Sequence, residues 1–150
     1  MQDATFRRAM PATAGAYPLE NRMAGPQLVA QLTSGRHAVL ATSRPDGRPH
    51  AIPTGLVLHH RSVWLPVTRG AVRLANVAAH PWASVVMLEG TGPTHALVIL
   101  EGPAVAVDRP DEGVLRTAQQ RRRDMSWASS WIRLSPERIL SYAGSAIRSA

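Results

Sequence analysis

Short runs of apolar residues, bounded by glycine, proline and polar residues, divide most of this chain into predicted strands. Many of these runs are rich in valine, isoleucine and leucine, which favours strands over helices. The predicted strands are 37–43, 50–59, 63–67, 82–89, 96–107, 131–134 and 139–143. Apolar residues at helical spacing predict three short helices, at 26–33, 71–79 and 111–125.

The first two predicted strands form a hairpin. They are joined by Pro45-Asp46-Gly47, whose residue types favour the backbone angles of a tight reversal. The second strand contains Pro49 and Pro53, which cannot donate ladder hydrogen bonds and therefore indicate an edge strand or a bulge. Unpaired backbone groups on such an edge are available to a ligand, so the hairpin is also a candidate binding edge.

These elements predict a mainly β protein of the α+β class. Six or seven antiparallel strands with two or three short helices are typical of a compact or half-open β-barrel. Gly102-Pro103 interrupts the longest strand and predicts a bend, as at a barrel corner. Residues 1–24 are polar and mixed, and we expect a flexible N-terminal arm ahead of one domain at 25–150.

Composition limits the classes of protein and of chemistry. At 150 residues, with 45% hydrophobic and 18% charged residues, the chain is expected to form one soluble domain. No run approaches the roughly 20 apolar residues of a membrane span, and we expect a cytoplasmic protein with no membrane partner. The chain has no cysteine, and all 17 basic residues are arginine, so thiolate chemistry and catalytic lysines are excluded.

The formal net charge of +7 has two interpretations. It indicates an anionic partner, such as a phosphorylated or polycarboxylate cofactor, or it only keeps the protein soluble. The one compact basic cluster, 121–123, has no nucleic-acid recognition motif beside it, so no nucleic-acid partner is predicted.

No metal site or catalytic side chain is predicted. His59 and His60 are adjacent in a strand and point to opposite faces, and the other histidines lack ligand spacing. Glu89 and Glu101 lie next to glycines near strand ends, which favours solvated carboxylates over a glycosidase pair. The four tryptophans are interpreted as core or interface anchors rather than as stacking surfaces for bases.

The segment 67–73 is a candidate anion site. It passes from a strand end through Gly70 into the first turn of a helix, where backbone N–H groups and the helix dipole attract anions. Arg69 and Arg73 are four residues apart, so one helical face could present two guanidinium groups to phosphate oxygens. The alternative is that both arginines are only solvated at the start of a helix. The position of the segment after a proline-marked edge strand favours a ligand site.

Four segments in this order resemble the FMN-binding split-barrel superfamily, which includes pyridoxamine 5'-phosphate oxidases and reductases that use the deazaflavin F₄₂₀. They are LATSRPDGRPHAIP, VTRGAVRLANVAAHPWASVV, VILEGPAVAV and WIRLSPERILSYAG. The resemblance implies a homodimer of six-stranded antiparallel split β-barrels with two cofactor sites at the dimer interface.

The resemblance also implies which residues bind the cofactor. In the family, the second hairpin strand lies along the flavin or deazaflavin ring, and the following strand end and helix start hold the phosphate. The implied ring contacts are Ile52, Pro53, Thr54 and Gly55, and the implied phosphate contacts are Pro66, Val67, Thr68, Arg69 and Arg73.

The chain departs from the oxidases of this superfamily at several positions. Ala71-Val72-Arg73 stands where the family often has Ser-Arg-Lys, and Ile52 and Val57 replace the arginine and lysine that brace FMN. The C-terminal substrate-binding extension of those oxidases is not found. These differences argue against pyridoxamine-phosphate oxidation.

The reading we favour is an F₄₂₀-dependent oxidoreductase that transfers hydride to a small organic acceptor, because an arginine-rich groove suits the oligoglutamate tail of that cofactor. The alternatives are an FMN-dependent flavoprotein, a flavin or deazaflavin carrier, a haem binder with His59 or His95 as ligand, and a barrel without a cofactor. Trp127 and Trp131 are candidates for the pocket wall, with burial in an interface as the alternative.

Overall fold

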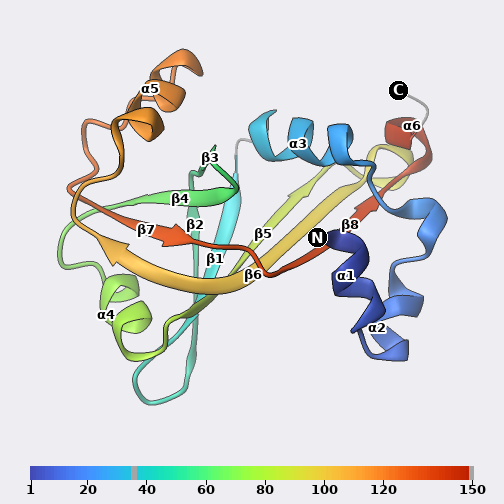
Figure 1. Cartoon of the computed structure of the whole chain (residues 1–150), viewed down its shortest axis with the longest axis horizontal. Coiled ribbons are helices and arrows are strands. Elements are labelled where there is room, and N and C mark those ends of the chain that lie inside the picture. The colour runs from blue at the N-terminus through green and yellow to red at the C-terminus, as the bar shows by residue number, and fades with distance from the viewer. Residues whose placement is uncertain (35–36, 149–150) are drawn as a thin grey trace.

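A computed structural model describes residues 1–34 and 37–148 of the chain (Figure 1). In this part, eight antiparallel strands form a sheet with the order β2-β1-β5-β6-β7-β4-β3, and β8 pairs with β6. The strands are β1 Ala38–Ser43, β2 Pro49–Thr54, β3 Val57–His59, β4 Ser62–Val67, β5 Trp82–Glu89, β6 Ala96–Val107, β7 Ser130–Leu134 and β8 Arg138–Ala143. The fold is α+β and mainly antiparallel.

The described residues contain eight strands where six or seven were predicted, because the predicted strand 50–59 is two strands. It divides at Gly55 and Leu56 into β2 and β3, which pair with different neighbours. Residues 35–36 and 149–150, which belong to the predicted domain 25–150, lie outside the described part.

Six α-helices accompany the sheet in the described chain, against two or three predicted. They are α1 Gln2–Arg7, α2 Pro11–Ala16, α3 Gly25–Ser34, α4 Val72–Ala79, α5 Glu112–Gln120 and α6 Ser145–Arg148, with 3₁₀ turns η1 Leu19–Asn21 and η2 Gly92–Thr94. None of the described helices is long and apolar enough to span a membrane. The predicted helix 111–125 ends early because Arg122 adopts the left-handed conformation (φ 52°), which terminates a helix.

The hairpin is confirmed. β1 and β2 pair in register from Ala38 with Thr54 to Ser43 with Pro49, and β2 has no other neighbour among the described strands. The turn is closed by the Gly47 N–H, which donates to the Arg44 carbonyl at 2.8 Å, while Gly47 has a φ of 84°. The prolines therefore lie on an edge strand, as predicted.

β6 is the long strand that connects the two halves of the sheet (Figure 1). Its first half pairs with β5 on one edge and β8 on the other, and after Gly102 the strand β7 takes the place of β8. A Cβ at position 102 would lie 2.1 Å from the Ser135 carbonyl oxygen in the β7–β8 connection. Glycine is required where this connection crosses the strand.

The main core fills the inner face of the sheet. Leu40, Val85 and Leu100 are almost completely buried, and Leu32 of α3 and Val77 of α4 belong to the same cluster. A smaller second cluster lies beneath α5 and contains Val57, Trp64, Val114, Ala118 and Trp131. α5 is therefore fixed over β3, β4 and β7, which decides the position of the loop that follows it.

The N-terminal segment, predicted as a flexible arm, contains α1, α2 and η1. Thr5 Oγ1 accepts a hydrogen bond from the Ile139 N–H at 3.0 Å, and Ser141 Oγ donates to Gln2 Oε1 at 2.6 Å. Phe6 is 8% exposed. α1 thus covers the free edge of β8, which protects an otherwise unpaired strand; its mobility in solution stays a prediction.

Candidate functional site

The residues expected along the cofactor ring do not share one face of β2. Ile52 packs against the main core, whereas Pro53 is exposed on the outer face beside Val39, because neighbouring strand residues point to opposite sides. Gly55 follows β2, at the break before β3. A ligand on one side of β2 can therefore contact the backbone of this edge strand and every second side chain, but not Ile52 and Pro53 together.

Gly55 and Pro66, two of the predicted site residues, line one cavity. It has a volume of about 330 Å³, and its remaining lining residues are Arg123, Asp124, Met125 and Trp127, from the segment after α5. The end of β2, the strand β4 and the loop after α5 meet here.

A larger groove of about 1020 Å³ shares three of these residues: Arg123, Asp124 and Met125. It continues along α5 and reaches Arg69, Ser129 and Trp131. Its lining combines apolar side chains, such as Leu115, Ala118 and Ala128, with a larger number of polar side chains, among them three arginines and three carboxylates. Apolar surface together with placed polar groups is typical of sites for organic cofactors.

Arg123 was not predicted as a site residue. Its Nη1 donates a hydrogen bond to the Leu56 carbonyl at the break between β2 and β3. Burial lowers the pKa of the Arg123 guanidinium, and the positive charge of Arg121 lowers it further. In the sequence Arg123 belongs to a run of three arginines, and no local signal distinguishes it from exposed Arg122.

The β4–α4 junction is joined to the loop after α5. The Arg69 N–H donates to Ser129 Oγ at 2.7 Å, and the Ser129 N–H donates to the Val67 carbonyl at 3.1 Å. α4 starts at Val72 without a side-chain cap. In the described chain the N–H groups of Val72 and Arg73 have no acceptor, so this helix start has donors available for an anion.

The two predicted arginines do not share a helical face. Arg69 precedes α4, is exposed, and lines the large groove. Arg73 is half-buried in the first turn of α4, and its Nε is a buried donor without a partner in the described structure. Burial also lowers the pKa of Arg73. Thr68 is exposed, whereas Pro66 and Val67 are buried.

His59 is enclosed by α5. Its Nδ1 lies 3.2 Å from Thr117 Oγ1, and a Cβ at Gly113 would lie 2.5 Å from its Nε2. Both ring nitrogens thus lie against α5, so a haem iron bound to His59 would have to displace its contacts with this helix. Among the described residues, no three histidine or carboxylate side chains gather as metal ligands.

The glutamate and tryptophan candidates mostly make contacts that stabilise the fold. Glu101 pairs with Arg138, with 3.0 Å between Oε2 and Nη1. Trp131 is 2% exposed and anchors the second cluster, whereas Trp127 is 50% exposed and lines the smaller cavity. The interpretation of tryptophans as core anchors is confirmed for Trp64 and Trp131.

A protein-family model for pyridoxamine 5'-phosphate oxidase matches residues 24–143. The chain belongs to this family. The match includes all eight strands of the described structure, α3 to α5 and both cavities, and leaves the N-terminal helices outside. The resemblance to the flavin-binding split-barrel superfamily is thereby confirmed at the level of the family.

Solved structures share the fold. The conserved hypothetical protein Rv2991 from Mycobacterium tuberculosis is 22% identical, with a TM-score of 0.68 over 85% of this chain and 89% of that chain. The heme storage protein HutZ from Vibrio cholerae is 19% identical, with a TM-score of 0.65 over 81% and 97% of the two chains. A protein described as an F₄₂₀ reductase is 17% identical, with a TM-score of 0.60 over 74% and 94%. No curated protein matches the sequence.

Proposed function

We propose that the protein is an oxidoreductase that binds the deazaflavin F₄₂₀ and transfers hydride to a small organic acceptor. The observation that carries the proposal is the large groove, which shares Arg123, Asp124 and Met125 with the cavity beside Gly55 and reaches Arg69, just before α4. The nine residues assigned from the resemblance remain the proposed contacts, with Arg69 assigned to the anionic tail instead of the phosphate because it lines the groove, and Arg123 is added to them.

The residues present fit a phosphorylated cofactor with an anionic tail. The unpaired N–H groups of Val72 and Arg73 and the unpartnered Nε of Arg73 are donors suited to phosphate oxygens. Arg69 and Arg109 line the groove and suit the carboxylates of an oligoglutamate tail; Asp108, Glu112 and Asp124 line it too, so the assignment rests on these two arginines and not on the net charge of the lining. A bound deazaflavin would supply the hydride, while the protein binds it, orients it and excludes water.

FMN is the alternative cofactor, because it shares the ring and phosphate and lacks the tail. F₄₂₀ therefore requires Arg69 and Arg109 in the groove for its tail, whereas FMN does not. Both cofactors require Arg73 for the phosphate. A haem protein is the alternative from another class, supported by the shared fold of HutZ; since His59 is enclosed, His95 is its candidate ligand.

The decisive experiment is a fluorescence titration of the purified apoprotein with F₄₂₀, FMN and a deazaflavin that lacks phosphate and tail. F₄₂₀ is expected to bind more tightly than both. Arg73→Ala is expected to weaken F₄₂₀ and FMN by about tenfold each, as loss of a charge-assisted hydrogen bond implies. Arg69→Ala is expected to weaken only F₄₂₀, and exposed Arg44→Ala is the control of equal charge.

Each result leads to a different conclusion. Preference for FMN over F₄₂₀ would assign the protein to the flavin branch. Binding of neither would overturn the cofactor assignment, and a Soret band that disappears in His95→Ala would establish the haem alternative. Bound F₄₂₀H₂ that is not oxidised by any acceptor would favour a carrier over an enzyme.

We also propose that the functional unit is a homodimer. On the outer face of the sheet, Pro53, Val39, Val86 and Ile99 are cross-strand neighbours across four strands, and Leu88 lies on the same face of β5. Leu88 is 60% exposed and Val39 is 39% exposed. An apolar face of this kind suits self-association through a two-fold axis. Sedimentation should show a dimer that Leu88→Arg converts to monomer; a monomeric wild-type protein would refute the proposal.

A further inference from the structure

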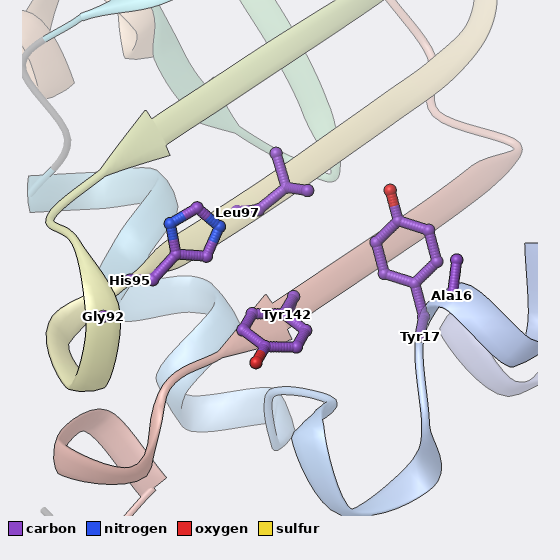
Figure 2. Close-up of a pocket in the computed structure, with 6 residues that line it drawn as sticks. All are labelled: Ala16, Tyr17, Gly92, His95, Leu97 and Tyr142. Atoms are coloured by element: carbon purple, nitrogen blue, oxygen red, sulfur yellow. The ribbon is translucent and has the colours of Figure 1, made fainter.

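A third cavity is lined by residues from the segment 16–17, from the 3₁₀ turn η2 and the start of β6, and from β8. The N-terminal helices and β8 lie on the opposite side of the molecule from α5 (Figure 1). The cavity has a volume of about 410 Å³, which is within the range of small-ligand sites. It is lined by Ala16, Tyr17, Gly92, His95, Leu97 and Tyr142 (Figure 2). None of these six residues carries a carboxylate or a guanidinium group.

One wall of the cavity is provided by the N-terminal segment. The chain has two tyrosines, Tyr17 and Tyr142, and both line this cavity. Tyr17 is held by Arg22, whose Nε donates to the Tyr17 carbonyl at 2.9 Å, and its ring lies 6.1 Å from that of Phe6. The family match starts at residue 24, so this wall is an addition to the family core.

The other wall is formed by His95 and Tyr142, whose rings meet edge to face with 5.4 Å between centroids. Leu97 is the cross-strand neighbour of Tyr142 and adds an aliphatic surface (Figure 2). In the described chain, neither tyrosine hydroxyl and neither ring nitrogen of His95 has a hydrogen-bond partner. Aromatic surfaces are thus combined with three polar side chains that have no hydrogen-bond partner, and the hydroxyls of Tyr17 and Tyr142 point in different directions (Figure 2).

We propose that this cavity binds an uncharged, planar aromatic molecule that carries a carbonyl oxygen, such as a quinone of one or two rings. Aromatic side chains favour planar π-systems in stacked or edge contacts. The tyrosine hydroxyls are donors for a carbonyl oxygen, and the absence of charged lining residues disfavours an ionic ligand. The proposal goes beyond the cofactor site and does not depend on it.

The test uses the whole apoprotein, labelled with 3-fluorotyrosine and observed by ¹⁹F NMR. Only two resonances are expected, and Tyr17→Phe and Tyr142→Phe assign them by removing one each. Titration with menadione, a naphthoquinone, is expected to shift both resonances with a common midpoint below about 1 mM. The saturated bicyclic ketone 2-decalone has the carbonyl group and similar size without planarity, and is expected to leave both resonances unshifted.

Variants on both walls locate the binding. Tyr17→Ala and His95→Leu are each expected to weaken menadione binding by about threefold to tenfold, the range of single aromatic contacts. Leu19→Ala, exposed in the same segment, is the control and should keep wild-type affinity. Since the two walls belong to different elements, a loss in both variants cannot come from disorder of the N-terminal segment alone.

Three results would overturn the proposal: no shift with menadione, equal shifts with 2-decalone, or equal weakening by Leu19→Ala and Tyr17→Ala. Because no F₄₂₀ or FMN is present, failure here is separate from failure of the proposed cofactor.

Discussion

Replacing Arg123 by alanine is the substitution that tests the architecture of the candidate site most directly. The guanidinium donates a hydrogen bond to the Leu56 carbonyl, at the break where β2 ends and β3 begins. Removal leaves this carbonyl without its charged donor and also removes the packing of the arginine stem. Hydrogen bonds to charged groups contribute about 1.5–3 kcal/mol, and the half-buried position favours the lower end of that range.

We therefore expect Arg123→Ala to lower the free energy of unfolding by about 2 kcal/mol, measured by urea denaturation. Because Arg123 lines both the large groove and the smaller cavity beside Gly55, F₄₂₀ affinity should also fall, by about tenfold, in the fluorescence titration. Arg123→Lys keeps the charge but not the planar fork, and should recover part of both losses.

Arg122→Ala is the matched control. Arg122 is the neighbouring residue with the same charge, but it is exposed, so its removal should change stability by less than about 0.5 kcal/mol. Equal stability and equal F₄₂₀ affinity of the Arg122 and Arg123 variants would refute the argument that Arg123 fixes the break and faces the ligand.

Three further outcomes are expected. Gly102→Ala should lower the free energy of unfolding, measured in urea, by more than about 2 kcal/mol, because its Cβ would lie 2.1 Å from the Ser135 carbonyl oxygen. Gly15→Ala is the control and should not lower it by this amount, because a Cβ at Gly15 would have no atom within 4 Å. Equal effects of the two substitutions would contradict the clash. Burial lowers the pKa of His59 below its ordinary value, so the unfolded chain binds a proton at this residue first as pH falls. The free energy of unfolding should therefore decrease below about pH 6.5, and His59→Asn should remove this part of the pH dependence. A pKa above 6.5 for His59 in an NMR titration would disprove the direction of the shift. Thr5→Val, which removes the acceptor for the β8 backbone N–H, should speed tryptic cleavage within residues 1–24, and cleavage at the wild-type rate would show that this bond does not hold α1.

Much of the sheet could be predicted because its signals are local. The predicted ends of the strands 82–89 and 96–107 agree with β5 and β6, since apolar runs bounded by glycine and proline specify where a strand starts and stops. The edge position of β2 followed from Pro49 and Pro53 for the same reason. The division at Gly55 was missed, because a continuous apolar run does not show which strand pairs with which.

The candidate site was predictable only in part. Gly55 and Pro66 came from the resemblance and do line one cavity, but the shared helical face of Arg69 and Arg73 was wrong, because the helix starts only at Val72. Spacing in sequence becomes a shared face only inside a helix, and the start of a helix depends on the turn before it.

The sequence by itself determined the family, the antiparallel strands, the proline-marked edge and an arginine-rich surface without thiol or lysine chemistry. Only the tertiary structure decided that Arg123 reaches Leu56 and Gly55, residues almost seventy positions earlier in the chain. It also decided that Tyr17 and Tyr142 share a cavity. Local patterns report the conformation of neighbouring residues, whereas these contacts depend on how α5 and α1 pack against the sheet.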